Sequence, residues 1–160
     1  MTTEEKAYIA GFLDGDGCVM LQLVRRKDYV LGYQIRASIV FYQKTKHEHH
    51  LHWLKNYLRD GYIRRRPDGM SEYTIVGFAA AKRVLELLLP HLRLKRKHAE
   101  IVLKVIQRTP GAGGRAYTPE LLLELAEDVD QYLRLNYSKK RKNTLTTLRQ
   151  FLVSQQLVSP

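Results

Sequence analysis

Apolar and polar side chains alternate along residues 18–26 and again, more regularly, along residues 33–43. A period of two is the period of a β-strand that buries one face, and no helix reproduces it over this length. In the second stretch the odd positions are the apolar ones: Tyr33, Ile35, Ala37, Ile39 and Phe41. With a loop over residues 28–32 between them, the two stretches predict a long hairpin.

Helical periodicity surrounds this hairpin. A helix is expected over residues 2–13, with Thr2 and Glu5 at capping-box spacing and with Gly15 and Gly17 ending it. A second hairpin is expected over residues 62–66 and 72–76, around a Pro-Asp-Gly turn. Further helices are expected over residues 46–59, 79–89, 95–108, 119–135 and 143–155. This order predicts an α+β fold with an antiparallel sheet, in one domain over residues 1–160.

The charge of the chain points to a polyanionic partner. Lys and Arg number 27 against 16 Asp and Glu, a formal net charge of +11. The basic residues cluster in runs at 24–27, 63–66, 92–98 and 138–142. Such runs at the ends of strands and helices favour nucleic acid over an ordinary solvated face or a membrane surface. The lone Cys18 forms no intrachain disulfide, and without a long apolar run or a signal peptide a soluble intracellular protein is expected.

One face of the expected sheet carries side chains that can bond base edges. Arg pairs with guanine, Gln with adenine and Glu with cytosine in the major groove. A strand as long as residues 33–43 reaches about 35 Å, close to one turn of B-DNA. An ordinary solvated sheet face also favours such residues, so both interpretations stay open from the pattern alone. The polar-face residues are Gln22, Arg26, Gln34, Arg36, Ser38, Arg64, Arg66, Glu72 and Thr74.

The segment YIAGFLDGDG (8–17) ends a helix with two carboxylates, Asp14 and Asp16, where the helix dipole is unfavourable for them. A simple turn is one explanation. The other starts from Ala7, Ala10 and Gly11, whose small side chains allow a second copy of the helix to approach. Two such helix ends would bring the acids together around divalent cations, as in nucleases that use two metals, and Mg²⁺ needs only one or two carboxylates.

The same segment resembles the nine-residue signature of the LAGLIDADG homing endonucleases, at residues 9–17. One signature followed by two hairpins is similar to the single-motif, homodimeric members encoded in chloroplast introns. The resemblance continues through Gln43-Lys44-Thr45, Gly61-Tyr62-Ile63-Arg64, residues 92–97, Asn136 and Ser138-Lys139, and so covers nearly the whole chain. It implies an αββαββα core with a saddle-shaped four-stranded sheet and extra C-terminal helices.

The resemblance also implies roles for single residues. Asp16 matches the metal-binding acid, and Gly15 the position that offers its main-chain carbonyl to the metal. Asp14 matches the other acid of the signature, with a more structural role and a place at the dimer interface beside Ala7, Ala10 and Gly11.

Three further positions are implied to be catalytic. Gln43 matches a polar residue that positions water, and Lys95 a basic residue that stabilises charge near the scissile phosphate. His47 stands where the family often has Arg, so its charge depends on pH. Without the family match, Gln43 is a strand-end amide and Lys95 one more phosphate contact.

The implied protein is a homodimeric, intron-encoded homing endonuclease that cuts long pseudopalindromic DNA in both strands and leaves 3′ overhangs. Mg²⁺ is the expected cofactor, with Mn²⁺ or Ca²⁺ as substitutes and Ca²⁺ without cleavage. Residues 1–17 are assigned to the dimer interface, 18–76 mainly to DNA reading and 109–160 to C-terminal helices. DNA contacts are expected from Met20, Gln22, Val24, Arg26, Tyr29, Gln34, Arg36, Ser38, Val40, Arg64, Arg66, Glu72, Thr74, Lys139, Arg141 and Lys142.

Two alternatives are weighed against this one. A LAGLIDADG-type RNA maturase or DNA-binding regulator would bind nucleic acid without cutting it, but Asp16, Gln43 and Lys95 favour the nuclease. An RNA-binding sheet would show exposed aromatic pairs, which are not expected here. The histidine-rich string 47–52 does not complete a zinc site. A chloroplast location is expected, with the mitochondrion as the alternative organelle.

Overall fold

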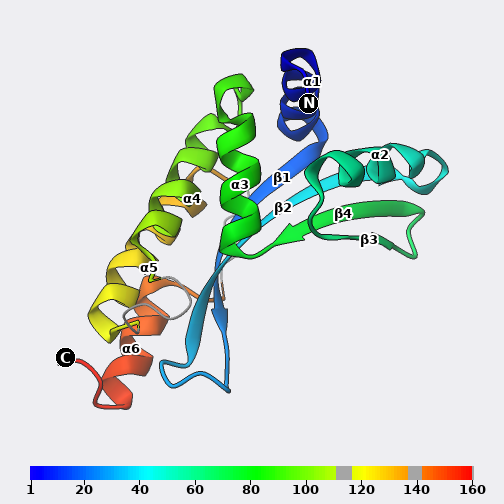
Figure 1. Cartoon of the computed structure of the whole chain (residues 1–160). Coiled ribbons are helices and arrows are strands. Elements are labelled where there is room, and N and C mark those ends of the chain that lie inside the picture. The colour runs from blue at the N-terminus through cyan, green and yellow to red at the C-terminus, as the bar shows by residue number, and fades with distance from the viewer. Residues whose placement is uncertain (111–116, 137–141, 160) are drawn as a thin grey trace. The chain divides into compact units, whose positions relative to one another are not determined.

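The computed structural model describes residues 1–110, 117–136 and 142–159. These residues form α-helices and one four-stranded sheet in the order α1 β1 β2 α2 β3 β4 α3 α4 α5 α6 (Figure 1). The elements are α1 (Thr3–Asp16), β1 (Gly17–Arg25), β2 (Tyr33–Lys44), α2 (His49–Leu58), β3 (Tyr62–Arg65), β4 (Met70–Val76), α3 (Phe78–Leu88), α4 (Arg96–Arg108), α5 (Pro119–Arg134) and α6 (Leu145–Ser154), with short 3₁₀ turns η1 (Thr45–His47) and η2 (Leu89–His91). The predicted α+β fold with an αββαββα core is confirmed.

The chain divides into two compact units, and each is described by itself. Unit 1 comprises residues 1–20 and 37–103, and unit 2 comprises residues 21–36 and 104–160. Strands β1 and β2 and helix α4 contribute to both units. The expectation of a single domain over residues 1–160 stays a prediction beside this division.

The sheet of unit 1 explains why its strands alternate. The strand order is β1-β2-β4-β3, and β4 pairs antiparallel with both β2 and β3. Phe41 lies opposite Tyr73, and Tyr73 lies opposite Ile63, so one face is apolar across three strands. The rings of Phe41 and Tyr73 stack with centroids 6.0 Å apart, and both side chains are fully buried.

Helices cover that apolar face. Helix α2 packs against β3 and β4, while α3 packs against β4 and against α1, which lies beside it in Figure 1. From α1, the side chains of Ile9, Ala10 and Leu13 are completely buried. The apolar positions that recur every second residue in the strands and about every 3.6 residues in the helices are buried together in one core.

Helix α1 is longer than its glycines suggest. It continues through Gly15 to Asp16, so the prediction that Gly15 helps to end it is wrong. Gly15 lies at the surface, with nothing within 4 Å of where a Cβ would stand, so it imposes no turn. Gly17 is the C-cap, and a Cβ there would stand 2.6 Å from Cδ1 of Leu13. The close approach at Gly17, rather than the number of glycines, sets the end of the helix.

The expected helix over residues 46–59 begins later than its pattern indicated. Residues 45–47 form the 3₁₀ turn η1, and α2 starts at His49. The boundaries of the other predicted elements differ from the observed ones by at most two residues at each end.

In unit 2, the far end of the β1–β2 hairpin is held to the C-terminal helix α6. The guanidinium of Arg25 lies 3.9 Å from the ring centroid of Phe151 and 4.8 Å from that of Tyr33. The same group donates to the carbonyl of Gly32 at 2.6 Å. Asn143 Nδ2 donates to the Leu23 carbonyl at 3.0 Å. Cation–π contacts and hydrogen bonds thus connect elements that are far apart in the sequence.

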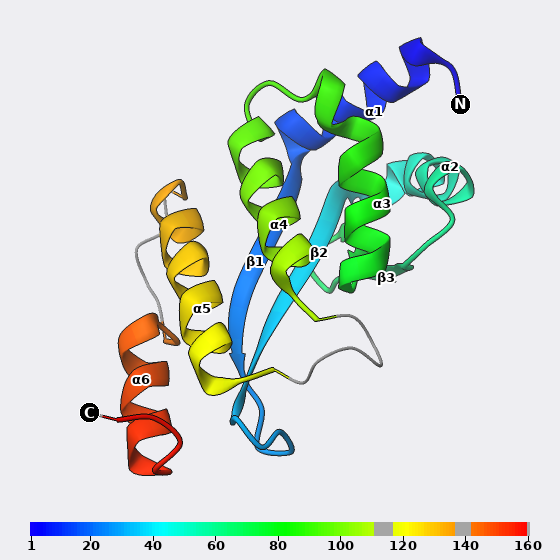
Figure 2. The ribbon, with the colours of Figure 1, turned by 60° about the vertical axis from the view of Figure 1, so that its left-hand side comes forward.

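Helices α5 and α6 lie side by side in unit 2, as Figure 2 shows. Asp128 of α5 is buried and accepts from Lys104 Nζ at 2.7 Å and from Arg108 at 2.8 Å. Two cations compensate this carboxylate, as a buried charge requires. Among the residues that the structure describes, no helix is long and apolar enough to cross a membrane.

Gly61 provides a test of the α2–β3 connection. Its φ is +82°, and a Cβ would stand 2.1 Å from the carbonyl oxygen of Thr74. Gly61→Ala is expected to lower the free energy of unfolding by at least about 2 kcal/mol, from left-handed backbone strain plus the clash. The measurement is urea denaturation followed by circular dichroism.

Gly69→Ala is the matched control, since its φ is +78° but nothing lies within 4 Å of its Cβ position. Only the backbone term of about 1 kcal/mol is expected there. Equal losses for the two variants would show that the close approach at Gly61 does not matter.

Candidate active site

The two carboxylates that end α1 lie in different surroundings. The Asp14 carboxylate accepts hydrogen bonds from the main-chain N–H groups of Arg93 at 2.7 Å, Leu94 at 3.2 Å and Lys95 at 2.9 Å. These groups precede the first turn of α4. The positive end of the α4 dipole thus compensates a charge that the C-terminus of α1 disfavours. The expected structural role of Asp14 agrees with these bonds.

The side chain of Lys95 reaches the same place. Its Nζ donates to the main-chain carbonyl of Asp14. Burial raises the pKa of the Cys18 thiol, and the nearby positive charge of Lys95 partly offsets this. Lys95 is therefore close to Asp14, two residues before Asp16, and to Cys18, two residues after it.

Asp16 is exposed and makes no hydrogen bond or ion pair with another side chain in the part of the chain that the structure describes. Gly15 lies in the last turn of α1, where main-chain carbonyls lack intrahelical partners. One exposed carboxylate and one free carbonyl are hard oxygen donors of the kind that Mg²⁺ takes together with water and phosphate.

The described residues of a single protomer do not complete a metal site by themselves. Among the described residues, no group of three His, Cys, Asp or Glu side chains is placed to hold a metal ion. Asp16 and Gly15 fit a cation only if the remaining ligands are water, phosphate or a second protomer.

Gln43 and His47 come from the end of β2 and from η1. In an antiparallel hairpin the first residues of β1 lie beside the last residues of β2. Asp16, just before β1, and Gln43, near the end of β2, therefore lie at the same end of the hairpin, in unit 1. Gln43 Oε1 accepts from the Lys44 main-chain N–H at 2.9 Å, and His47 is exposed. No hydrogen bond among the described residues joins Gln43 or His47 to Asp16.

A buried carboxylate in this region was not foreseen. Glu48, directly after His47, is only 9% exposed and accepts from Arg65 and from Ser71. These donors hold the pKa of Glu48 down at about 2. Two signals existed in the sequence: an acid at the start of a helix, and Arg65 on the apolar side of the β3 alternation.

Fewer of the small residues of α1 are exposed than the sequence predicted. Ala7 and Gly11 are exposed, and with Asp14 they line an open hollow beside Pro90–Arg93 and Arg96. Ala10 is completely buried within the protomer, so its assignment to the dimer interface is wrong. Around the helix Ala10 lies about 60° from both Ala7 and Leu13. It is the observed burial that groups it with Ile9 and Leu13.

The polar face of the sheet is more closed than expected. Arg64 and Arg66 are exposed, whereas Ser38, Val40, Glu72 and Thr74 are at most 9% exposed, so a fully solvated face was a wrong expectation. Thr74 lies between Val40 and Tyr62 on neighbouring strands, and these cover it. Arg64 donates to Glu72 at 2.9 Å, and Arg66 lies 4.0 Å from it.

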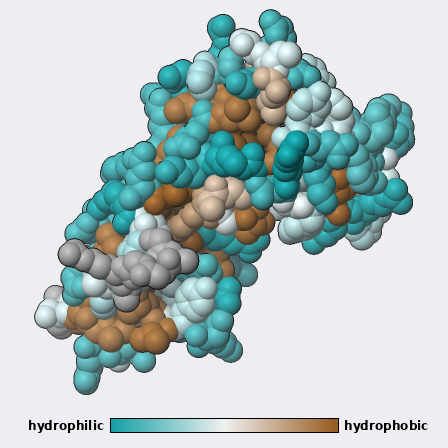
Figure 3. Space-filling view, in the orientation of Figure 1, coloured by the Kyte–Doolittle hydropathy of each residue, from teal (hydrophilic) through white to brown (hydrophobic). Residues whose placement is uncertain are grey.

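The remaining expected DNA contacts have varied exposure. Gln22, Tyr29, Arg36 and Lys142 are exposed, and Met20, Val24, Arg26 and Gln34 are half-buried. Lys139 and Arg141 lie outside the described residues. Figure 3 shows mostly hydrophilic residues over α2, β3 and β4 on the visible face. The assignment of these residues to DNA stays a prediction.

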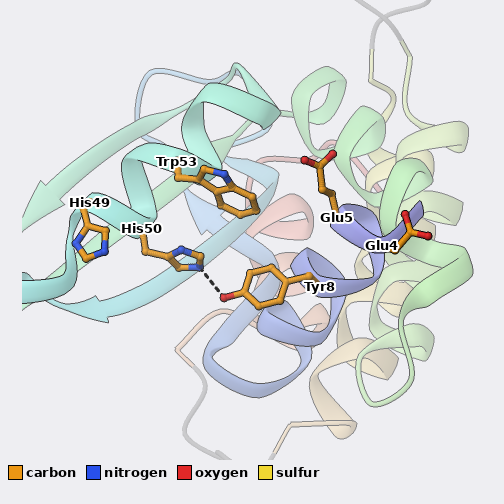
Figure 4. A pocket seen from close by; sticks show the side chains of 6 residues that line it. All are labelled: Glu4, Glu5, Tyr8, His49, His50 and Trp53. Atoms are coloured by element: carbon orange, nitrogen blue, oxygen red, sulfur yellow. Dashed lines mark hydrogen bonds between the residues drawn. The ribbon is translucent and has the colours of Figure 1, made fainter. Parts of the chain in front are cut away.

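The histidines of residues 47–52 contact different partners and do not converge on one metal position. Tyr8 and His50 point toward each other in Figure 4, with Tyr8 Oη 3.2 Å from His50 Nε2. His50 stacks on Trp53, with ring centroids 5.2 Å apart. His52 lies 3.3 Å from Glu48. The aromatic pocket that contains Tyr8, His50 and Trp53 also has Glu4, Glu5 and His49 on its lining.

Comparisons with known proteins agree with this geometry. Residues 9–106 match the family model described as LAGLIDADG endonuclease. The chain is 39% identical over 146 residues to the DNA endonuclease I-CvuI of Chlorella vulgaris, covering 91% of this chain and 88% of the relative. It is 36% identical over 147 residues to the DNA endonuclease I-CreI of Chlamydomonas reinhardtii, covering 92% and 88%.

Solved structures are similar as well. The crystal structure of I-CvuI in complex with its target in the presence of Ca has a TM-score of 0.90, with 37% identity over 97% of this chain and 96% of that one. The DNA complex of the archaeal intron-encoded homing endonuclease I-Vdi141I has a TM-score of 0.82 at 16% identity, over 97% of this chain and 98% of that one, and so supports the fold alone.

The contrast between the two acids can be measured by stability. Asp14→Ala removes the acceptor of the main-chain N–H groups before α4 and is expected to cost about 1–3 kcal/mol of unfolding free energy. Asp16→Ala, two residues away and exposed, is the control and should stay within about 0.5 kcal/mol of the parent protein. Chemical denaturation of both variants measures the difference. A larger loss for Asp16→Ala would reverse the assigned roles.

Proposed function

Because the chain belongs to the LAGLIDADG endonuclease family, we propose that it is an intron-encoded homing endonuclease that cuts both strands of DNA at a specific site. Its curated relatives carry the name DNA endonuclease, and one of them has been crystallised on its target. The net charge of +11 suits a DNA partner, since each neutralised phosphate releases counterions.

The observation that carries the proposal is the difference between Asp14 and Asp16. Asp14 accepts from the main-chain N–H groups just before α4, whereas Asp16 is exposed and has no side-chain partner among the described residues. A carboxylate kept at a helix end without a partner is costly unless a cation meets it during function. Asp16, with the Gly15 carbonyl, is therefore the proposed metal-binding position.

The proposed chemistry is hydrolysis of a phosphodiester. A bound Mg²⁺ would lower the pKa of water and stabilise the leaving oxygen. Lys95 is already held close to Asp14 and Cys18, so its ammonium can stabilise charge on the scissile phosphate. Gln43 is proposed to orient water, with His47, four residues further along, as a further catalytic residue.

A homodimer with two-fold symmetry is part of the proposal. The described residues of one protomer supply too few side-chain ligands for a closed metal site, and Ala7 and Gly11 expose a small-residue surface beside Asp14. A two-fold dimer implies a long, pseudopalindromic target with one half-site for each protomer. Cleavage that leaves 3′ overhangs is proposed from the family resemblance.

DNA contacts are proposed along the polar face and in the C-terminal region. Exposed Arg64, Arg66 and Gln22 are the candidates for base edges, and Lys142 for the phosphate backbone. The curated relatives come from the algae Chlorella vulgaris and Chlamydomonas reinhardtii. An organelle-encoded, chloroplast protein is the corresponding proposal for this chain.

The metal assignment is tested by Asp16→Asn. The substitution keeps the shape but removes the charge that Mg²⁺ needs, so cleavage is expected to fall by at least about 100-fold. DNA affinity in a gel-shift assay should change little, because binding depends mainly on the basic residues. Normal cutting by this variant would refute the metal assignment.

The substrate for this assay is a plasmid that carries a site selected by cleavage from a randomised library. With Mg²⁺ the parent protein should convert supercoiled plasmid to the linear form. Retarded DNA without any linear product would instead favour a maturase or a DNA-binding regulator.

The dimer contact is tested by Gly11→Leu. No atom lies within 4 Å of the Gly11 Cβ position in the protomer, and Leu favours a helix more than Gly by about 1 kcal/mol, so the fold should persist. Sedimentation velocity should then show monomers, because the larger side chain keeps the two helices apart. Ala79→Leu, at an exposed position of α3, is the control and should remain dimeric. An unchanged dimer for Gly11→Leu would rule out the proposed contact.

A further inference from the structure

A polar network in unit 1 surrounds Glu48, the residue between η1 and α2. Arg65 donates to both carboxylate oxygens, from Nε at 2.9 Å and from Nη2 at 3.1 Å. Ser71 Oγ, completely buried, donates to Oε2 at 2.6 Å. The carboxylate thus ties the start of α2 to β3 and β4 at once.

The same network holds the segment before Glu48. Ser71 Oγ lies 3.1 Å from Thr45 Oγ1, and the Thr45 main-chain N–H donates to the Gly69 carbonyl at 2.9 Å. The Glu48 main-chain N–H donates back to the Thr45 carbonyl at 3.1 Å. Ser71 also lies directly opposite Gln43 in the sheet. Residues 43–48 are therefore fastened to β4 at their beginning, middle and end.

We propose that Glu48 is a positioning residue that fixes Gln43 and His47 for cleavage. The proposal rests on the proposed endonuclease function, since it concerns the residues assigned to the reaction there. His47 projects from the last position of η1, one residue before the carboxylate, and is itself exposed. A short 3₁₀ turn has weak hydrogen bonds of its own, so its orientation depends on such outside anchors.

A role in stability alone explains the network less well. The Arg65 side chain is 72% exposed, and ion pairs that exposed add little to folding free energy. The Glu48 side chain is only 11% exposed, and the two Arg65 bonds have the bidentate form that fixes direction. Such an arrangement contributes more to geometry than to free energy, and an error of about 1 Å in the placement of a reacting group can cost 100-fold in rate.

The experiment measures single-turnover cleavage of the selected DNA site with protein in saturating excess. Glu48→Gln keeps the size and the Ser71 contact but loses the charge that binds Arg65. Its rate constant is expected to fall by roughly 10- to 100-fold, while DNA affinity changes less than about threefold. A merely destabilising change would lower only the fraction of active protein, and with protein in saturating excess it would leave the rate constant unchanged.

Two variants make the comparison specific. Glu86→Gln on α3 removes the same charge from a 52% exposed side chain that forms an ion pair with Lys82, and should leave rate and affinity unchanged. The exchanged pair Glu48→Arg with Arg65→Glu preserves the net charge and should recover at least part of the lost rate. An exchanged pair slower than Glu48→Gln would contradict the coupling.

A second readout does not depend on cleavage. In NMR spectra of the free protein, Glu48→Gln should shift the His47 ring and Gln43 side-chain amide signals, with the His91 ring signals unchanged. If the parent protein fails to cut any selected site, the proposed function falls and this role falls with it. If the parent protein cuts and Glu48→Gln cuts equally fast, only the role of Glu48 is refuted.

Discussion

The carboxylate of Asp14 accepts hydrogen bonds from the main-chain N–H groups before α4, and much of unit 1 depends on that contact. It joins the C-terminus of α1 to the N-terminus of α4, whose dipoles have opposite signs at that point. It also brings Lys95 to the last turn of α1. Asp16 is then left at the surface, two residues further along, as a carboxylate free for another purpose.

The consequence for function is a division of work inside one short motif. Two acids at the C-terminus of a helix are electrostatically unfavourable. In the described part of the fold Asp14 is compensated by main-chain N–H groups, and only Asp16 is not. The buried side of the same helix carries Ile9, Ala10 and Leu13, and α1 packs against α3 and η2. The last turn of α1 therefore contains both the structural acid Asp14, which lies beside the basic Lys95, and the candidate metal ligand Asp16.

Much of the fold could be predicted because its strands and helices obey simple periods. Alternation along β2 identified the apolar face correctly, since Phe41 and Tyr73 do stack in the core. The polar face was predicted less well, because periodicity assigns a side chain to a face but not its neighbours. Thr74 is polar by type and still buried, since Val40 and Tyr62 flank it on adjacent strands.

The site shows the same limit. The pairing of Asp14 with the main-chain N–H groups before α4 joins residues about eighty positions apart, and no local pattern encodes it. Ala10 was grouped with Ala7 and Gly11 by size, but it lies about 60° from both Ala7 and Leu13 around the helix, and the fold buries it. Glu48 went unnoticed because its partners, Arg65 and Ser71, come from the second hairpin.

The central claim is that Asp16, and not Asp14, is the metal ligand of the signature. The most direct measurement is anomalous scattering from Mn²⁺ in crystals of the protein bound to its selected DNA target. The account predicts an anomalous peak at the Asp16 carboxylate and the Gly15 carbonyl, with Asp14 still bonded to the main-chain N–H groups before α4. A peak at Asp14, or none near Asp16, would contradict it.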